Sequence, residues 1–150
     1  MKISLLETIE QVYESYNDVK NTFDNLESEV IIDNYLQKLF KYGKIFAIYD
    51  EIQNRYCGFA AVYMNDMETK TAYISLIGVS LEYKNKHLGT DLLCFVEEQA
   101  VERGMQSIIL EVKKHNSIAI RFYQKNGYEF FEKETETSRF MSKILIYIDD

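Results

Sequence analysis

The sequence predicts an α+β fold, in which a mixed, mostly antiparallel sheet of about six strands has a central β-α-β crossover and flanking helices. Three observations support this prediction. Apolar residues recur with a helical period through the first 42 residues, and the pattern changes to that of strands between residues 44 and 79. A helix, a buried strand and a second helix follow, before two closing strands.

The first two elements are predicted helices. Residues Ser4–Tyr16 carry apolar side chains at i, i+3 and i+4 spacing. Ser4 is placed as the N-cap, and Glu7 follows three residues later, as in a capping box. Residues Glu27–Tyr42 carry a broad apolar stripe, and Gly43 is suited to end this second helix.

Three strands are predicted next, over Lys44–Tyr49, Tyr56–Met64 and Thr71–Val79. Short polar turns separate them, so they should form an antiparallel meander. The helix Leu88–Arg103 then leads into the apolar strand Ser107–Val112. This strand should lie parallel to the third strand, because a helical crossover joins the two.

The closing elements are a short helix over Ser117–Lys125 and two strands, Tyr128–Lys133 and Phe140–Ile148. The length of 150 residues, with 47% hydrophobic and 27% charged residues, predicts one domain over residues 1–150. Cys57 and Cys94 lie far apart in apolar surroundings, which favours two reduced thiols in the core. A disulfide or redox pair is the alternative.

Charge and hydropathy exclude several classes of function. The net charge of −7 argues against a nucleic-acid-binding protein and against a polybasic membrane-surface protein. No apolar run approaches the ~18 residues of a membrane span, and we find no signal-peptide core. We therefore expect a cytoplasmic protein with no nucleic-acid and no membrane partner.

The segment between the third strand and the third helix is predicted to bind an anion. Residues 84–90 read K-N-K-H-L-G-T, so a cationic loop leads into a helix. The N–H groups at a helix N-terminus attract phosphate, and Lys84, Lys86 and His87 would reinforce this attraction. The loop matches neither a Walker A motif nor G-x-G-x-x-G. A phosphate or pyrophosphate site is one interpretation, and a solvated basic turn is the other.

Residues 110–128 read L-E-V-K-K-H-N-S-I-A-I-R-F-Y-Q-K-N-G-Y. Together with the loop, helix and strand before it, this run resembles the Gcn5-related N-acetyltransferase (GNAT) superfamily over residues 71–130. The family loop reads Gln/Arg-x-x-Gly-x-Gly/Ala. Here Lys84 keeps the charge of the family's arginine, but His87 stands where the first glycine is usual.

The resemblance implies the acetyltransferase fold and transfer of an acetyl group from acetyl-CoA, as co-substrate, to a primary amine, without a metal. In that family the pantetheine arm lies between two splayed parallel strands. Backbone groups at Ile77 and Val79, together with the Asn116 side chain, would hold the arm. The pyrophosphate would be held by Lys84, Asn85, Lys86, His87, Leu88, Gly89 and Thr90.

The resemblance also implies two proton-transfer groups. Tyr123 stands at the family's position for the acid that protonates the leaving thiolate, and would also contact the cofactor; its reference pKa near 10 keeps it protonated. Glu111 is an acidic residue in an otherwise apolar strand. It is a candidate base for the amine, or else a structural carboxylate at the strand end. Glu82 and Tyr73 are further candidates for the base.

The acceptor is expected to be a cationic amine: a small molecule, an amino sugar or a protein N-terminus. Residues 83–125 hold seven basic and five acidic residues, so the negative excess of the chain lies elsewhere and would attract cations. Tyr35 and the turn Glu132–Arg139 stand where the family usually forms its acceptor pocket. The protein would be a monomer or homodimer. A non-catalytic acyl-CoA-binding regulatory module on the same fold is the alternative function.

Overall fold

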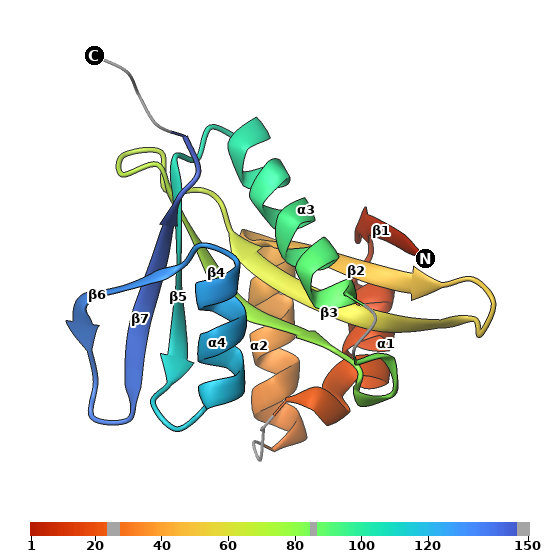
Figure 1. Ribbon diagram of the computed structural model, residues 1–150. Helices are drawn as coiled ribbons and strands as arrows, with labels where there is room; N and C mark the ends of the chain where they lie inside the picture. Colours follow the sequence, from red (N-terminus) through yellow and green to blue (C-terminus); the bar gives the residue numbers. More distant parts are fainter. Residues whose placement is uncertain (24–27, 85–86, 147–150) are drawn as a thin grey trace.

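The computed structural model describes residues 1–23, 28–84 and 87–146, which form a seven-stranded sheet with helices on both faces (Figure 1). The elements in chain order are β1 (Lys2–Leu5), α1 (Ile9–Val19), η1 (Lys20–Thr22), α2 (Glu29–Tyr42), β2 (Lys44–Asp50), β3 (Arg55–Tyr63), β4 (Thr71–Val79), η2 (Leu81–Tyr83), α3 (Leu88–Glu102), β5 (Ser107–Lys113), α4 (Ser117–Lys125), β6 (Glu129–Glu134) and β7 (Ser138–Ile144).

The predicted α+β class and the central crossover are confirmed. The strand order is β1-β2-β3-β4-β5-β7-β6, and β4 and β5 form the one parallel pair among the strands described. Helix α3 makes the crossover between them. The sheet has one strand more than the expected six, because the chain begins with β1.

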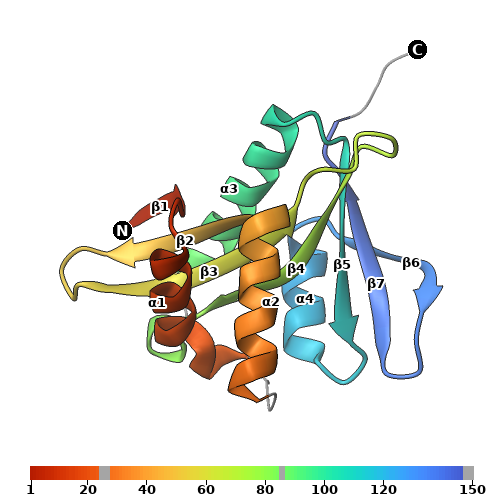
Figure 2. The same ribbon diagram turned by 180° about the vertical axis from the view of Figure 1, so that it is seen from behind.

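Two apolar layers hold the helices to the sheet. Helices α1 and α2 cover one face, with Val12, Leu36 and Phe59 in that layer, and α3 and α4 cover the other (Figure 2). The larger layer, under α3, contains Leu92, Leu93 and many strand residues. In the part of the chain that the structure describes, no helix is long and apolar enough to cross a membrane.

The predicted helix Ser4–Tyr16 is wrong in its first turn. Residues Lys2–Leu5 form β1, which pairs antiparallel with β2, and α1 begins only at Ile9. The N-cap is Thr8 instead of Ser4. Its side chain accepts from the Gln11 backbone N–H at 3.2 Å, and the Gln11 side chain accepts in return from the Thr8 backbone N–H at 3.2 Å. This reciprocal capping box stabilises the helix start more fully than Ser4 could.

Two further predictions need correction. The closing strands are shifted: β6 begins at Glu129, and β7 begins at Ser138 rather than Phe140; the predicted end of the last strand lies outside the described residues. Cys57 is buried on β3 as expected, but Cys94 is exposed on α3, because it lies on the outer side of that helix. No disulfide joins them.

Strands β4 and β5 pair only along their first halves. The register runs from Thr71 opposite Ser107 to Ile74 opposite Leu110, and it stops there although both strands continue. On its other side β4 carries an irregularity at the same level. Ala61 of β3 faces Leu76 but Val62 faces Ile74, so Ser75 is an extra residue. Such a β-bulge bends its strand, which explains why β4 turns away from β5.

A tyrosine fixes the segment that follows β4. The Tyr83 hydroxyl, at the end of η2, donates to Oδ2 of Asp50 at 2.5 Å, and the Tyr83 side chain is buried. The hydrogen bond to the Asp50 carboxylate, more than burial, raises the pKa of Tyr83 to about 12. The same hydrogen bond lowers the pKa of Asp50. The chain entering α3 is therefore tied to the far end of β2.

This contact predicts a loss of stability in alkali. The unfolded tyrosine titrates near pH 10, whereas folded Tyr83 keeps its proton to about pH 12, so between these values the unfolded state binds fewer protons. The contribution of the Tyr83–Asp50 hydrogen bond to the free energy of unfolding is complete below pH 10 and is lost as the pH rises towards 12. In urea titrations, Tyr83→Phe should reduce the slope of unfolding free energy against pH, and Tyr42→Phe, on an exposed side chain, should not. Equal slopes in all three proteins would contradict this.

Candidate active site

The second half of β4 is the centre of the candidate site. From Ser75 to Val79 this strand has its partner β3 on one side, but no pairing with β5 on the other. Backbone N–H and C=O groups need hydrogen-bond partners, so this edge can pair with the amide groups of an extended ligand. Ile77 and Val79, predicted to hold pantetheine, both lie in this stretch and belong to the apolar layer under α3 and α4.

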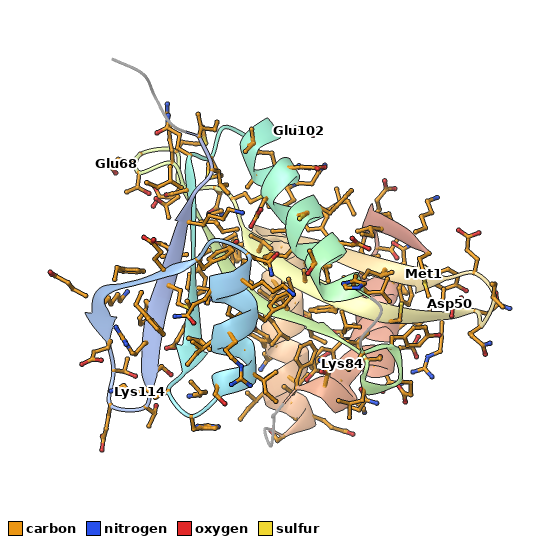
Figure 3. The ribbon with its side chains drawn as sticks, viewed as in Figure 1. Met1, Asp50, Glu68, Lys84, Glu102 and Lys114 are labelled. Atoms are coloured by element: carbon orange, nitrogen blue, oxygen red, sulfur yellow. The ribbon has the colours of Figure 1, made fainter. Side chains whose placement is uncertain are left out.

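The start of α3 is an anion-binding geometry. His87 is its N-cap and makes no side-chain capping bond. The first N–H groups of the helix, at Leu88, Gly89 and Thr90, therefore point outward without an acceptor from the described residues. Lys84 lies beside this helix start (Figure 3), and partial burial lowers its pKa. Asn85 and Lys86, also predicted to contact the pyrophosphate, lie outside the described residues.

His87 has a left-handed backbone, with φ of 59° and ψ of 13°. Glycine adopts this conformation without strain, whereas a side chain costs about 1–2 kcal/mol. This explains the family's preference for glycine at the position. The His87 side chain is exposed, so the turn tolerates it.

Gly89 brings the parts of the site together. A Cβ on Gly89 would lie 3.4 Å from Cζ of Phe122 on α4 and 4.0 Å from Cγ2 of Val79 on β4. The start of α3 therefore lies close both to the end of β4 and to one face of α4. Asn116, at the start of α4, accepts a hydrogen bond from Ala119 N–H at 3.1 Å through Oδ1, which leaves its amide N–H₂ for a ligand.

Tyr123 lies on the inner side of α4, against the apolar layer. Burial raises its pKa to about 12, so it remains protonated at neutral pH. In the described residues its hydroxyl makes no hydrogen bond, and neighbouring rings hold the side chain instead. Phe122 packs at 5.5 Å and Tyr128 at 5.8 Å between ring centroids, both close to edge-on. The hydroxyl is thus available as a proton donor.

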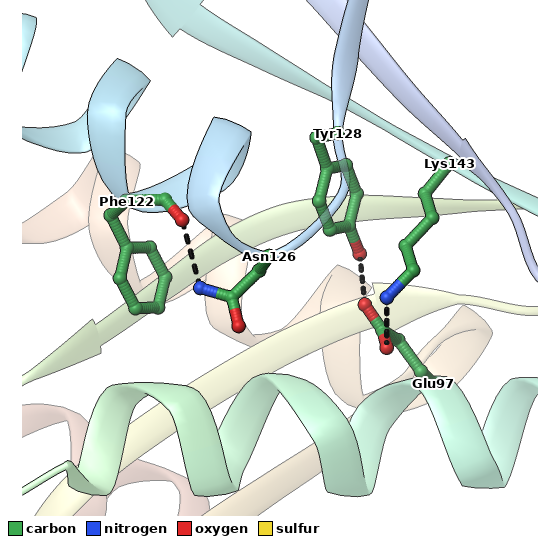
Figure 4. A network of polar contacts seen from close by, with 5 residues as sticks. All are labelled: Glu97, Phe122, Asn126, Tyr128 and Lys143. Atoms are coloured by element: carbon green, nitrogen blue, oxygen red, sulfur yellow. Dashed lines mark hydrogen bonds and ion pairs between the residues drawn. The ribbon is translucent and has the colours of Figure 1, made fainter.

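A buried polar network secures the ring beside Tyr123 (Figure 4). The Tyr128 hydroxyl donates to Oε2 of Glu97 at 2.8 Å, and Lys143 Nζ lies 3.0 Å from Oε1 of the same carboxylate. Asn126 closes the end of α4 through a 2.8 Å bond to the Phe122 carbonyl. Helix α3, strand β7 and the segment that follows α4 are thereby joined. Sequence analysis missed Glu97 and Lys143, because no local pattern marks a contact between residues 46 positions apart.

Glu111 lies on the opposite face of the sheet. It is exposed on β5. The pKa of Tyr73 on β4 is raised first by burial of Tyr73 and second by the negative charge of Glu111. Both side chains therefore lie near one another on the face that α1 and α2 cover. Glu82 is instead on η2, where it accepts from Asn21 at 3.3 Å. No contact in the described chain brings Glu82 to Glu111.

Tyr35, predicted to help form the acceptor pocket, lies on this same face. The Tyr35 hydroxyl of α2 is 2.6 Å from Oγ of Ser75, the extra residue of the bulge. Burial raises the pKa of Tyr35. The predicted turn Glu132–Arg139 overlaps the end of β6 and the start of β7, and Phe140, the residue after it, lies opposite Glu111. Among the described residues no group of three or more His, Cys, Asp or Glu side chains could hold a metal ion.

Solved structures support the fold. The ribosomal-protein-S18-alanine N-acetyltransferase of Escherichia coli superposes with a TM-score of 0.80 at 19% identity, over 99% of this chain and 96% of that one. Tetrahymena Gcn5 gives a TM-score of 0.77 at 12% identity, over 100% of both chains. The PaiA N-acetyltransferase of Thermoplasma acidophilum, in complex with coenzyme A, gives 0.70 at 21% identity, over 96% and 99%.

Sequence comparison identifies the family. The uncharacterized protein YdhI of Bacillus subtilis is 44% identical over 55 residues, which are 37% of this chain and 34% of that protein. The chain thus matches about a third of the length of this curated relative. A sequence profile described as "Acetyltransferase (GNAT) family" matches residues 9–128, well over half of the chain. With a central strand that loses its partner β5 beyond Ile74, and this match across most of its length, the chain belongs to the GNAT acetyltransferase family.

Proposed function

We propose that the protein transfers an acetyl group from acetyl-CoA directly to a primary amine. The observation that carries this proposal is that β4–β5 pairing stops at Ile74, which leaves an edge of β4 that runs to Val79, beside the N-terminus of α3. An extended pantetheine arm would pair with the β4 edge around Ile77 and Val79. The pyrophosphate would accept from the N–H groups of Leu88, Gly89 and Thr90, with Lys84 as its counter-charge.

The two faces of the sheet would divide the chemistry. The amine nitrogen attacks the thioester carbon, the C–S bond breaks, and a backbone N–H of the β4 edge stabilises the oxyanion. Tyr123, on the α4 side, would give its proton to the departing sulfur. Glu111, on the other side, would take a proton from the substrate ammonium, directly or through water, so that the neutral amine can attack. No metal enters this mechanism.

Thiol release tests the proposal. Acetyl-CoA with a panel of primary amines should release CoA thiol, detected with a thiol-reactive dye, and acetyl-CoA alone should raise the melting temperature. Tight acetyl-CoA binding without turnover for any amine would instead identify a non-catalytic acyl-CoA-binding module. Neither binding nor turnover would contradict both functions.

Tyr123→Phe should lower kcat about 10–100-fold with little change in the KM for acetyl-CoA, because a general acid acts in the transition state. Steady-state kinetics at neutral pH measure this. Tyr42→Phe, on an exposed tyrosine outside the site, is the matched control and should leave kcat unaltered. An unaltered kcat in Tyr123→Phe would exclude Tyr123 as the acid.

Glu111→Gln should lower kcat/KM for the amine about 10–100-fold at neutral pH. The loss should shrink as the pH approaches the pKa of the amine, because free amine needs no base. Glu98→Gln, at an exposed position of α3, is the control. If Glu111→Gln retains full kcat/KM at neutral pH, Glu111 is a structural carboxylate.

His87→Gly should relieve the left-handed strain and raise the unfolding free energy by about 1 kcal/mol, measured in urea. Removing the side chain also lets the pyrophosphate approach the backbone more closely, so the KM for acetyl-CoA should stay constant or fall. His115→Gly, in the exposed loop before α4, is the control and should not stabilise. A weaker affinity in His87→Gly would show that the imidazole itself contacts the cofactor.

A further inference from the structure

A cavity of about 360 Å³ lies on the face of the sheet that carries Glu111, towards the end where β4 and β5 remain paired. Its apolar walls are Tyr63, Tyr73 and Ile109. Tyr73 links the cavity to the candidate site, because the Glu111 charge acts on its hydroxyl. The other end lies at the β3–β4 turn, where Glu68 is also found, away from Lys84 and the anion site (Figure 3).

The polar lining of this cavity offers oxygen acceptors for a cation. Asn65 uses its Nδ2 in a 3.0 Å bond to the Tyr42 carbonyl. Thr71 Oγ1 donates to the Thr69 carbonyl at 3.3 Å and also lies 3.1 Å from Ser107 Oγ. Their remaining oxygen lone pairs can accept further hydrogen bonds. The described lining residues include no Lys, Arg or His.

Asp66 supplies a negative charge to this lining. Its Oδ1 accepts from the Thr69 backbone N–H at 3.1 Å, and this hydrogen bond is the first cause that lowers the pKa of Asp66. The carboxylate is therefore ionised at neutral pH and keeps further lone pairs for a ligand. Tyrosine walls with an anionic, acceptor-rich end suit an alkylammonium group, whose methylenes pack on rings and whose N–H groups donate.

The distance between the cavity end at Thr71 and the level of Glu111 sets the length of the ligand. Thr71 lines the cavity and lies opposite Ser107, four residues before Glu111 on β5. At about 3.3 Å per residue, the cavity end is about 13 Å from the level of Glu111. Thr71, Tyr73, Ile109 and Glu111 alternate onto one face, so a straight chain can run between the two ends.

We propose that this cavity binds the distal ammonium group of a linear diamine acceptor, while its other amine lies at Glu111 and is acetylated. The proposal rests on the proposed function and names its substrate class. The distal group interacts with the Asp66 carboxylate and the tyrosine walls, and it undergoes no reaction.

The test compares α,ω-diaminoalkanes with 1-aminoalkanes of the same chain length, by thiol release from acetyl-CoA. The diamine should have a kcat/KM up to about fivefold above that of its matched monoamine once its nitrogens lie about 13 Å apart, as expected of an ion pair with the exposed Asp66. Diamines too short to reach Asp66 should show no preference, and added salt should reduce the preference of the long ones.

Asp66→Asn should bring the ratio of diamine to monoamine kcat/KM close to one. The asparagine oxygen can still accept from the Thr69 N–H, so the turn should remain folded. Glu68→Gln, in the same turn but outside the cavity lining, is the charge-matched control and should keep the preference.

A wild-type ratio of one at every length, or an unaltered ratio in Asp66→Asn, would overturn the diamine proposal while leaving acetyl transfer intact. Failure to acetylate any amine would contradict the proposed function instead. Calorimetric titration of the CoA-loaded protein with the 13 Å diamine then decides the cavity assignment. Binding that Asp66→Asn weakens supports it, and binding that this variant leaves unaltered overturns it.

Discussion

Hydrogen bonding of the backbone in the middle of the sheet is the constraint on which the site depends. Ser75 adds one residue to β4, and from this point β4 separates from β5. The Tyr35–Ser75 hydrogen bond joins the bulge to α2. The groups that β5 would otherwise satisfy are left along an apolar edge, where water is a poor substitute for an amide partner. Under the proposed function, an extended ligand beside β4 would take the place of β5 along this edge.

Helix α3 borders this opening with a buried apolar face, whereas α4 does so with partly buried residues. Helix α4 has no fully buried side chain. Tyr128, whose hydroxyl is bonded to Glu97 of α3, packs against Tyr123 and steadies the ring without occupying its hydroxyl. The sheet itself separates Tyr123 from Glu111, the two groups proposed to donate and to accept protons.

The parts of the structure that the sequence predicts depend on local patterns, and the parts that it does not predict depend on contacts between distant segments. A helical period of apolar residues, followed by a glycine, predicted α2 and α3. Short apolar runs between polar turns predicted the strands from β2 to β5. Strand β1 was missed because four residues are too few to distinguish a strand from a helix turn, and Leu5, Leu6 and Ile9 mimic a helical face. The bulge at Ser75 and the Glu97–Lys143 pair depend on contacts between distant segments. The placement of Tyr123 and Glu111 on opposite faces likewise required the register of the sheet.

The two outer strands have a consequence for how the protein behaves in a crowded solution. Strand β1 offers only four residues to a neighbouring molecule, and β6, which reads E-F-F-E-K-E, is charged and irregular in its pairing with β7. Short, charged or distorted edges resist the addition of a foreign strand and so discourage aggregation. The edge of β4 that lacks pairing with β5 lies inside the sheet, between β3 and β5, and not at either outer edge. The fold can thus leave backbone groups unpaired at its centre without promoting strand pairing between molecules.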